Sequence, residues 1–167
     1  MSHDSSLEPA LRAVEPAARL VPARHLRQVI NSLLDNDRRV PTNTDLPHWV
    51  TRDELVAADA LPSHVLAGTE PRLLLVTDPD DRMIEHLPRG EQLRAYWRVL
   101  FRAAVVAEYD RRPAAAAATL DRFGAAIARE VEYVFRTEHL AHPDQPAAAT
   151  YRMFAAVYLD LATFEPA

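Results

Sequence analysis

The sequence lacks two residue types on which many active sites depend. Cysteine is absent, which excludes disulfides, thiolate metal ligands and cysteine nucleophiles from this chain. Lysine is absent as well, because all 19 basic residues are arginine, so Schiff-base chemistry and the lysine of phosphate-binding P-loops are also excluded. Arginine in place of lysine, with abundant alanine and proline, is typical of a GC-rich genome. The arginine content alone therefore does not indicate phosphate binding.

Glycine is scarce, and long hydrophobic runs are missing. The three glycines, Gly68, Gly90 and Gly124, lie too far apart to build a phosphate-cradling loop, which argues against the usual nucleotide-binding folds. The sequence has no apolar run of membrane-spanning length and no secretory signal pattern at its N-terminus. We therefore expect a bacterial cytoplasmic protein that has no membrane partner.

Length and charge favour one acidic globular domain. The 167 residues carry 24 acidic and 19 basic side chains, for a formal net charge of −5. A net negative chain has no general attraction for nucleic acid, so we expect a protein partner or a homo-oligomer. We expect a flexible lead at residues 1–20, where Pro9 and Pro16 interrupt helices, followed by a single helical domain at residues 21–167.

Residues 91–112 show the clearest helical period and the densest large apolar side chains. Apolar residues, Trp97 among them, cover most of the helical wheel, so the pattern predicts a central helix hidden from water nearly all round. The exception is a ridge of three arginines at four-residue steps, Arg94, Arg98 and Arg102. Their guanidinium groups suit phosphates or an acidic partner, and they equally suit ion pairs within the fold.

Other amphipathic stretches predict helices at residues 22–35, 51–60 and 147–163, the second opened by a capping box from Thr51 to Glu54. A further helix is expected after Pro113 and the alanine run at residues 114–118, capped by Thr119 or Asp121 and ending before the stretch HLAHPDQP. We interpret Gly124 as a position where another helix approaches closely. The apolar run at residues 73–76 fits a strand or a helix, and because no second strand is evident we favour a short helix or an extended connector. The predicted fold is all-α, an irregular helical bundle of about four main helices plus short helices and long loops.

Few residues are candidates for chemistry. The densest cluster of potential metal ligands is Glu138, His139, His142 and Asp144, but no HExxH or ExxH pattern accompanies it. The alternative is a helix C-terminus where imidazoles interact with the negative end of the dipole. Glu108 continues the apolar side of the central helix and could act as a general acid or base, or it could simply pair with Arg112 one turn later.

The last predicted helix offers a candidate contact surface. Its exposed part, around Tyr151, Met153 and Tyr158, carries large side chains that a small bundle can leave uncovered. Such helix faces are frequent association sites. We expect the arginine ridge to guide the partner electrostatically.

Two stretches resemble helical N-terminal regions of large uncharacterised bacterial proteins. They are LVPARHLRQVI at residues 20–30 and LRAYWRVLFRAAV at residues 93–105. The resemblance implies helical structure, and it implies no activity because neither stretch carries a catalytic motif.

These observations lead to one main hypothesis and two alternatives. The main hypothesis is a non-enzymatic helical scaffold or protein-interaction module that uses no cofactor. The first alternative is a metal-dependent or acid/base enzyme using Glu108, Glu138, His139 and His142. The second is nucleic-acid or phosphate binding through the ridge of Arg94, Arg98 and Arg102, which the net negative charge disfavours.

Overall fold

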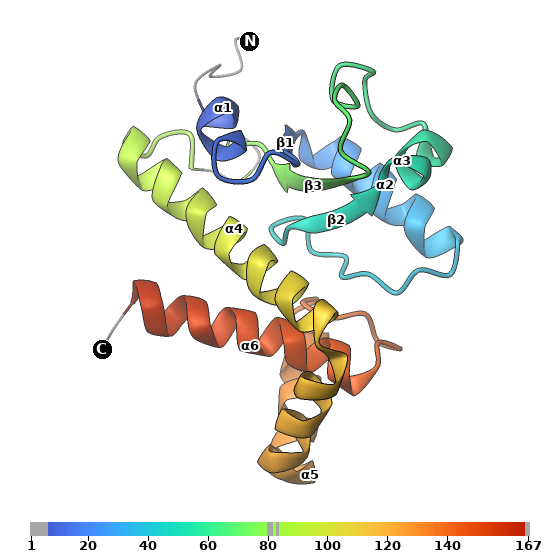
Figure 1. Ribbon diagram of the computed structural model, residues 1–167, viewed down its shortest axis with the longest axis vertical. Coiled ribbons are helices and arrows are strands. Elements are labelled where there is room, and N and C mark those ends of the chain that lie inside the picture. The colour runs from blue at the N-terminus through green and yellow to red at the C-terminus, as the bar shows by residue number, and fades with distance from the viewer. Residues whose placement is uncertain (1–6, 80–81, 83, 166–167) are drawn as a thin grey trace. The chain divides into compact units, whose positions relative to one another are not determined.

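The computed structural model describes residues 7–79, 82 and 84–165, and the chain divides into two compact units (Figure 1). The first unit comprises Met1–Arg38 and Thr44–Val99, and the second comprises Arg39–Asn43 and Leu100–Ala167. The long helix α4, Arg89–Arg111, contributes residues to both. Each unit has buried side chains of its own.

A three-stranded mixed sheet organises the first unit. The central strand β3, Arg72–Thr77, pairs in parallel with β1, Ala18–Val21, and antiparallel with β2, His48–Thr51. All residues of β3 after Arg72 are buried. A strand that is covered on both faces reads as a continuous apolar run rather than an alternating one, which explains the sequence at residues 73–76.

This sheet shows that the prediction of an all-α fold is wrong. Residues 73–76 lie in β3 and form neither a helix nor a connector. The short apolar run did not reveal its conformation because its pairing partners are distant: Leu74 pairs with Ala18 on one side and with Trp49 on the other. Four-residue strands such as β1 and β2 are too short for a period of two to stand out.

The first twenty residues contain regular structure within the part that is described. Helix α1 spans Leu7–Arg12, where Leu7 and Leu11 are buried, and strand β1 covers residues on both sides of the expected boundary at residue 20. Residues 1–6 of the expected lead lie outside the described residues. The segment therefore supplies both an edge strand and core side chains to the first unit.

Helices α2 and α3 of the first unit agree with the sequence pattern. Helix α2, Ala23–Asp35, buries Leu26, Val29, Ile30 and Leu33 and passes behind β3 and β2 in the view of Figure 1. Helix α3, Arg52–Ala58, begins at a complete capping box between Thr51 and Glu54, as predicted. Both predictions are confirmed because they depend on local spacing alone.

Helix α4 has one buried side. Its buried residues follow one another at steps of one to four residues: Gln92, Tyr96, Val99, Leu100 and Ala103. Trp97 is 46% exposed, so the prediction of a helix hidden nearly all round is wrong. The helical wheel counted alanine as apolar, but an alanine side chain offers little surface to bury and does not demand a neighbour.

The second unit contains the C-terminal half of α4 together with α5, Pro113–Thr137, and α6, Ala147–Phe164. Its core is aromatic. Tyr151 of α6 lies with its ring centroid 6.1 Å from that of Tyr109 and 5.8 Å from that of Phe123, while Phe154 lies 6.2 Å from Phe135. Edge-to-face and tilted ring pairs of this kind stabilise a core beyond the area they bury.

Gly124 divides α5 at a kink. Its φ of 78° and ψ of 159° are not helical, and among the described residues no atom beyond its chain neighbours and the nearby backbone of its own helix lies within 4 Å of the place where a Cβ would stand. The interpretation of Gly124 as a point of close helix approach is therefore wrong. Glycine is needed here for its backbone conformation, which side chains bearing a Cβ disfavour.

Within the part of the chain that the structure describes, no helix combines the length and the hydrophobicity that crossing a bilayer requires.

Candidate functional site

The carboxyl ends of the two parallel strands meet at one edge of the sheet. Val21, the last residue of β1, pairs with Thr77, the last residue of β3, and the amide of Asp78 donates to the Val21 carbonyl at 3.0 Å. Loops and helix starts that follow parallel strands converge at this edge, which is where open α/β sheets commonly bind ligands. Here it brings the first turn of α2 close to the residues that follow β3.

A cleft with a volume of about 650 Å³ opens at this edge. Its walls come from α1, β1, the first turn of α2, the loop at residues 62–65, the segment after β3 and the start of α4. The ionisable side chains that line it, apart from Arg19, are Glu8, Arg24, His25, His64, Asp78 and Glu85. All of these elements belong to the first unit.

Several of the polar groups around the cleft already have partners. Glu8 Oε2 accepts a hydrogen bond from the Leu20 amide at 3.1 Å. The Gln92 side-chain amide donates to the carbonyls of Glu85 and Leu87 at 3.1 and 3.0 Å. Asp78 is only 5% exposed. These contacts fasten α1 to β1 and the start of α4 to the segment before it.

Two basic side chains at the cleft, those of Arg24 and His64, are exposed. Neither side chain makes a hydrogen bond or an ion pair to any residue that the structure describes. His25 is partly buried, and its Nδ1 is enclosed without a hydrogen-bond partner among the described residues. An exposed imidazole or guanidinium that lines a cleft and has no side-chain partner among the described residues is available to a ligand, which applies to His64 and Arg24.

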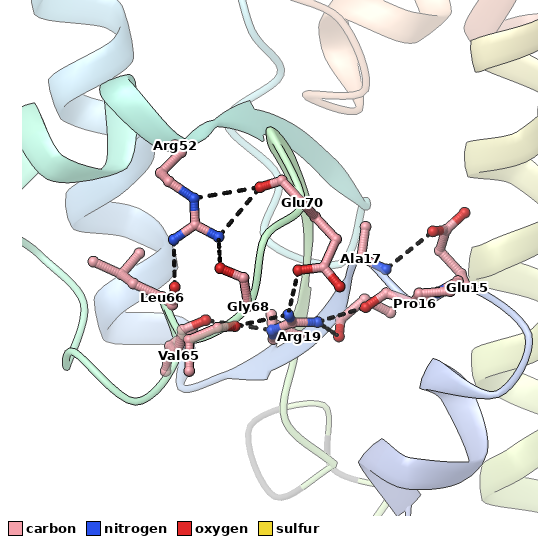
Figure 2. Close-up of polar contacts among 11 residues, drawn as sticks. Glu15, Pro16, Ala17, Arg19, Arg52, Val65, Leu66, Gly68 and Glu70 are labelled. Atoms are coloured by element: carbon pink, nitrogen blue, oxygen red, sulfur yellow. Dashed lines mark hydrogen bonds and ion pairs between the residues drawn. The ribbon is translucent and has the colours of Figure 1, made fainter.

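Arg19 lines the cleft, and its guanidinium holds the loop at residues 65–70 (Figure 2). Its guanidinium is 3% exposed and donates to the carbonyls of Pro16 at 2.7 Å, Val65 at 3.3 Å and Ala67 at 3.1 Å, and it lies 3.3 Å from Glu70 Oε2. Burial, and next the nearby Arg12, lower the pKa of Arg19, whereas Glu70 opposes the effect. The ring of carbonyls and the carboxylate compensate for burying this cation.

Arg52 holds the same loop from the other side, as Figure 2 shows. It donates to the Gly68 carbonyl at 3.0 Å, to the Glu70 carbonyl at 3.2 Å through Nη2, and also to the Leu66 carbonyl. Gly68 has a φ of 120°, and a Cβ there would overlap the Glu70 carboxylate. The loop at residues 65–70 is thus ordered by two guanidinium groups that gather its carbonyls.

The arginine ridge of α4 is engaged within the chain. Arg102 Nε lies 3.7 Å from Asp160 Oδ2, and Asp160 is 2% exposed. Arg94 and Arg98 also interact with other groups of the protein. This arrangement matches the intramolecular alternative considered from the sequence, and it leaves less guanidinium surface for a phosphate.

The cluster at the end of α5 is a turn. His139 has a φ of 55°, the Asp144 amide donates to His142 Nδ1 at 3.2 Å, and the His142 amide donates to Gln145 Oε1 at 3.2 Å. Across residues 7–79, 82 and 84–165, no three His, Cys, Asp or Glu side chains are placed to hold a metal ion. Glu138 and its neighbours are therefore not brought together as ligands.

Glu108 lies at the surface of the second unit. Its carboxylate pairs with Arg111 at 3.0 Å and with Arg112 at 2.8 Å, and its side chain is 46% exposed. Exposed pairs of this kind stabilise a helix only slightly. The ion pair with Arg112 at i+4 is the one that the sequence offered as the alternative to an acid/base role.

The three candidate contact residues of α6 differ in exposure. Tyr151 is buried at 6%, and this burial, together with Tyr109, raises the pKa of its hydroxyl. Met153 is half-buried, whereas Tyr158 is 61% exposed. Tyr158 thus has the surface to contribute to a contact, and Tyr151 belongs to the core.

Sequence reasoning missed the cleft, and it missed the contacts by which Arg19 and Arg52 hold the loop at residues 65–70. The usable signal was the apolar run at residues 73–76 followed by Thr77, Asp78 and Pro79, which is typical of a buried strand that ends at a polar edge. Nothing comparable marked Arg19, since its acceptors lie up to 51 residues away along the chain.

Comparison with protein-family models, with curated proteins and with solved structures finds no match for this chain. The resemblance of residues 20–30 and 93–105 to bacterial N-terminal regions accordingly stays a prediction. What the protein does has to be argued from its own residues.

Proposed function

We propose that the protein is a non-enzymatic interaction module whose second unit binds a second copy of the same chain. The observation that carries the proposal is a set of large apolar side chains that are 39–71% exposed on α5 and α6. They are Phe123, Ile127, Tyr133, Val134, Tyr158, Leu159 and Leu161. The proposal retains a bacterial cytoplasmic setting, which the arginine-rich and alanine-rich composition favours.

The spacing of these residues supports a contact surface. Ile127 and Val134 are seven residues apart and share one side of α5, and Tyr158 and Leu161 are three apart on α6. The two helices pack against each other. We call Ile127, Val134, Tyr158 and Leu161 the α5/α6 apolar surface.

Charge favours a second copy as the occupant. The three aromatic side chains of the set, Phe123, Tyr133 and Tyr158, together expose about 250–450 Å² if each complete aromatic side chain offers about 150–250 Å². A standard interface buries roughly 800 Å² from each partner, so the apolar side chains would form its centre and polar residues around them the rest. The second unit has eight arginines and nine acidic residues, so its net charge of −1 hardly opposes self-association. The first unit carries the remaining −4 of the total −5.

Size-exclusion chromatography with light scattering tests the proposal. The wild-type chain should reach twice the monomer mass as its concentration rises, because apolar surface buried between copies stabilises the dimer. The double substitution Ile127→Ser with Val134→Ser should remain monomeric, with its helical circular dichroism unchanged.

The matched control changes two valines of the first unit, Val14→Ser with Val56→Ser. These side chains are 66% and 62% exposed, so the control removes a similar amount of apolar surface elsewhere. It should dimerise like the wild type. A wild-type chain that stays monomeric throughout, or a control that loses the dimer equally, would contradict the proposal.

A further inference from the structure

We propose that the cleft at the carboxyl edge of β1 and β3 binds a small metabolite carrying one oxyanion, a carboxylate or a phosphate, and also hydroxyl or amino groups. The cleft volume of about 650 Å³ suits such a molecule, since small-molecule sites span about 300–1,000 Å³. The inference goes beyond self-association, because the cleft lies wholly within the first unit and none of the residues of the α5/α6 apolar surface line it.

The oxyanion is placed by exposed donors whose side chains have no partner among the described residues. Arg24 comes from the first turn of α2, and His64 comes from the loop at residues 62–65. A guanidinium fork and an imidazole provide planar, directed hydrogen bonds to carboxylate or phosphate oxygens. His25, whose Nδ1 is enclosed, lines the cleft beside Arg24. The first turn of α2 contains no acidic residue, so no charge on this turn competes with the ligand.

The acidic side chains of the cleft limit what else the ligand can be. Glu8, Asp78 and Glu85 also line it, and Glu8 is already held by the Leu20 amide. Three carboxylates repel a ligand made only of negative groups, such as a polyphosphate. They accept hydrogen bonds from hydroxyl or amino groups. The lining as a whole therefore suits a singly charged oxyanion on a polar body.

The wall that carries His64 is formed in advance. Arg19 and Arg52 hold the carbonyls of residues 65–70, which directly follow His64 (Figure 2). A wall that is already ordered costs a ligand less conformational entropy on binding. Arg52 does not line the cleft, so we assign it as a positioning residue.

Isothermal titration calorimetry on the full chain tests the inference, with four probes: inorganic phosphate, acetate, a hexose phosphate and an α-amino acid. We expect one-to-one binding of the hexose phosphate or the amino acid, and the stronger of the two identifies phosphate or carboxylate as the preferred group. The bare ions should bind more weakly, because they lack the donors that meet the carboxylates.

Three variants locate the binding. Arg24→Ala should weaken it about tenfold or more through loss of a charge-assisted hydrogen bond. Arg27→Ala is the matched control, since it removes the same charge from an exposed position of the same helix that does not line the cleft. It should leave the affinity unchanged. Arg52→Ala should weaken binding and make the binding entropy more unfavourable, because the ligand then has to order the loop. If Arg52 only stabilises the fold, the binding entropy should stay unaltered.

Three results would overturn the inference. If none of the four probes binds, the cleft is not a site for such a ligand. Equal weakening by Arg24→Ala and Arg27→Ala would reduce it to general charge attraction. If bare phosphate or acetate binds as tightly as the larger probes, the proposal that the ligand also carries hydroxyl or amino groups is refuted. Loss of the dimer does not affect any of these readouts, so the two proposals fail separately.

Discussion

The two units reach order by different physical means. In the first, contacts are directional and join distant segments: β3 pairs with strands on either side, and Arg19 reaches acceptors 46 to 51 residues further along the chain. In the second, successive helices meet through aromatic rings such as Phe123, Tyr151 and Phe154. Hydrogen bonds specify one geometry, whereas apolar contacts tolerate variation. The first unit is accordingly suited to a preformed ligand cleft, and the second to a protein contact.

The tryptophans allow this comparison to be tested unit by unit. Both of them, Trp49 and Trp97, belong to the first unit, so tryptophan fluorescence follows that unit alone. Far-UV circular dichroism follows the helices of both units. A substitution that destabilises one unit should therefore shift the two signals differently.

Replacing the buried guanidinium should damage the first unit most. Arg19→Met leaves the carbonyls of Pro16, Val65 and Ala67, and the Glu70 carboxylate, without their donor. We expect the free energy of unfolding to fall by about 3–5 kcal/mol, because leaving a buried acceptor unsatisfied costs about 1–3 kcal/mol and three carbonyls lose their donor. Urea unfolding followed by tryptophan fluorescence measures the loss. Arg27→Met, at an exposed position, serves as the control. A loss of stability below about 1 kcal/mol in Arg19→Met would contradict the role given to the Arg19 guanidinium.

The kink of α5 should be the most sensitive backbone position of the second unit. Gly124→Ala places a Cβ on a backbone with φ 78° and ψ 159°, which should cost about 1–3 kcal/mol. Circular dichroism should show the destabilisation, while the tryptophan transition stays in place. Gly90→Ala, in the first turn of α4 with open space around it, should be neutral or slightly stabilising. Equal effects of the two substitutions would refute the role given to the kink.

A single buried hydroxyl should have a smaller effect. Tyr96 is fully buried, and its hydroxyl donates to the Thr77 carbonyl at the end of β3. Tyr96→Phe should lower the stability of the first unit by about 0.5–1.5 kcal/mol, the net contribution of one hydrogen bond. Tyr133→Phe is the control, because Tyr133 is 71% exposed. If the control loses as much stability as Tyr96→Phe, the hydrogen bond from Tyr96 to Thr77 does not explain the effect.

Acid should weaken the first unit slightly through Glu54. Burial acts to raise the pKa of Glu54, but hydrogen bonds from Arg38 and Thr51 outweigh it and lower this pKa below its usual 4.5. The charged form is therefore favoured in the folded state. Its contribution to stability is present above pH 4.5 and is lost as the pH falls below that value, through the folded-state pKa. Glu54→Gln should flatten this part of the stability profile, and an unchanged profile would contradict the assignment.

Local sequence patterns predicted the helices well and the sheet poorly. The apolar spacing of Leu26, Ile30 and Leu33, and the capping box at Thr51, each lie within a few residues and appear in the structure as expected. The strands did not emerge, because β1 and β2 are four residues long and pair with a strand more than twenty residues away. Short elements that depend on distant partners leave little local pattern.

For the candidate site residues, too, short-range contacts could be predicted from the sequence and long-range contacts could not. Sequence reasoning placed Glu108 beside Arg112 as one of two alternatives, and that short-range pair is present. It assigned Tyr151 to a surface, although rings from α4 and α5 bury it. The donors Arg24, His25 and His64 were not singled out, because only the pairing of β1 with β3 gathers them at one edge.

By itself the sequence determined what this protein is made of and where its long helices run, since composition excludes thiol and lysine chemistry and helical periods are local. Tertiary structure alone decided that residues 73–76 are a strand, that Arg19 is buried, that Gly124 kinks α5 and that a cleft exists. The physical reason is that a strand, a buried cation and a cleft each require partners supplied by other parts of the chain, whereas a helix satisfies its backbone within itself.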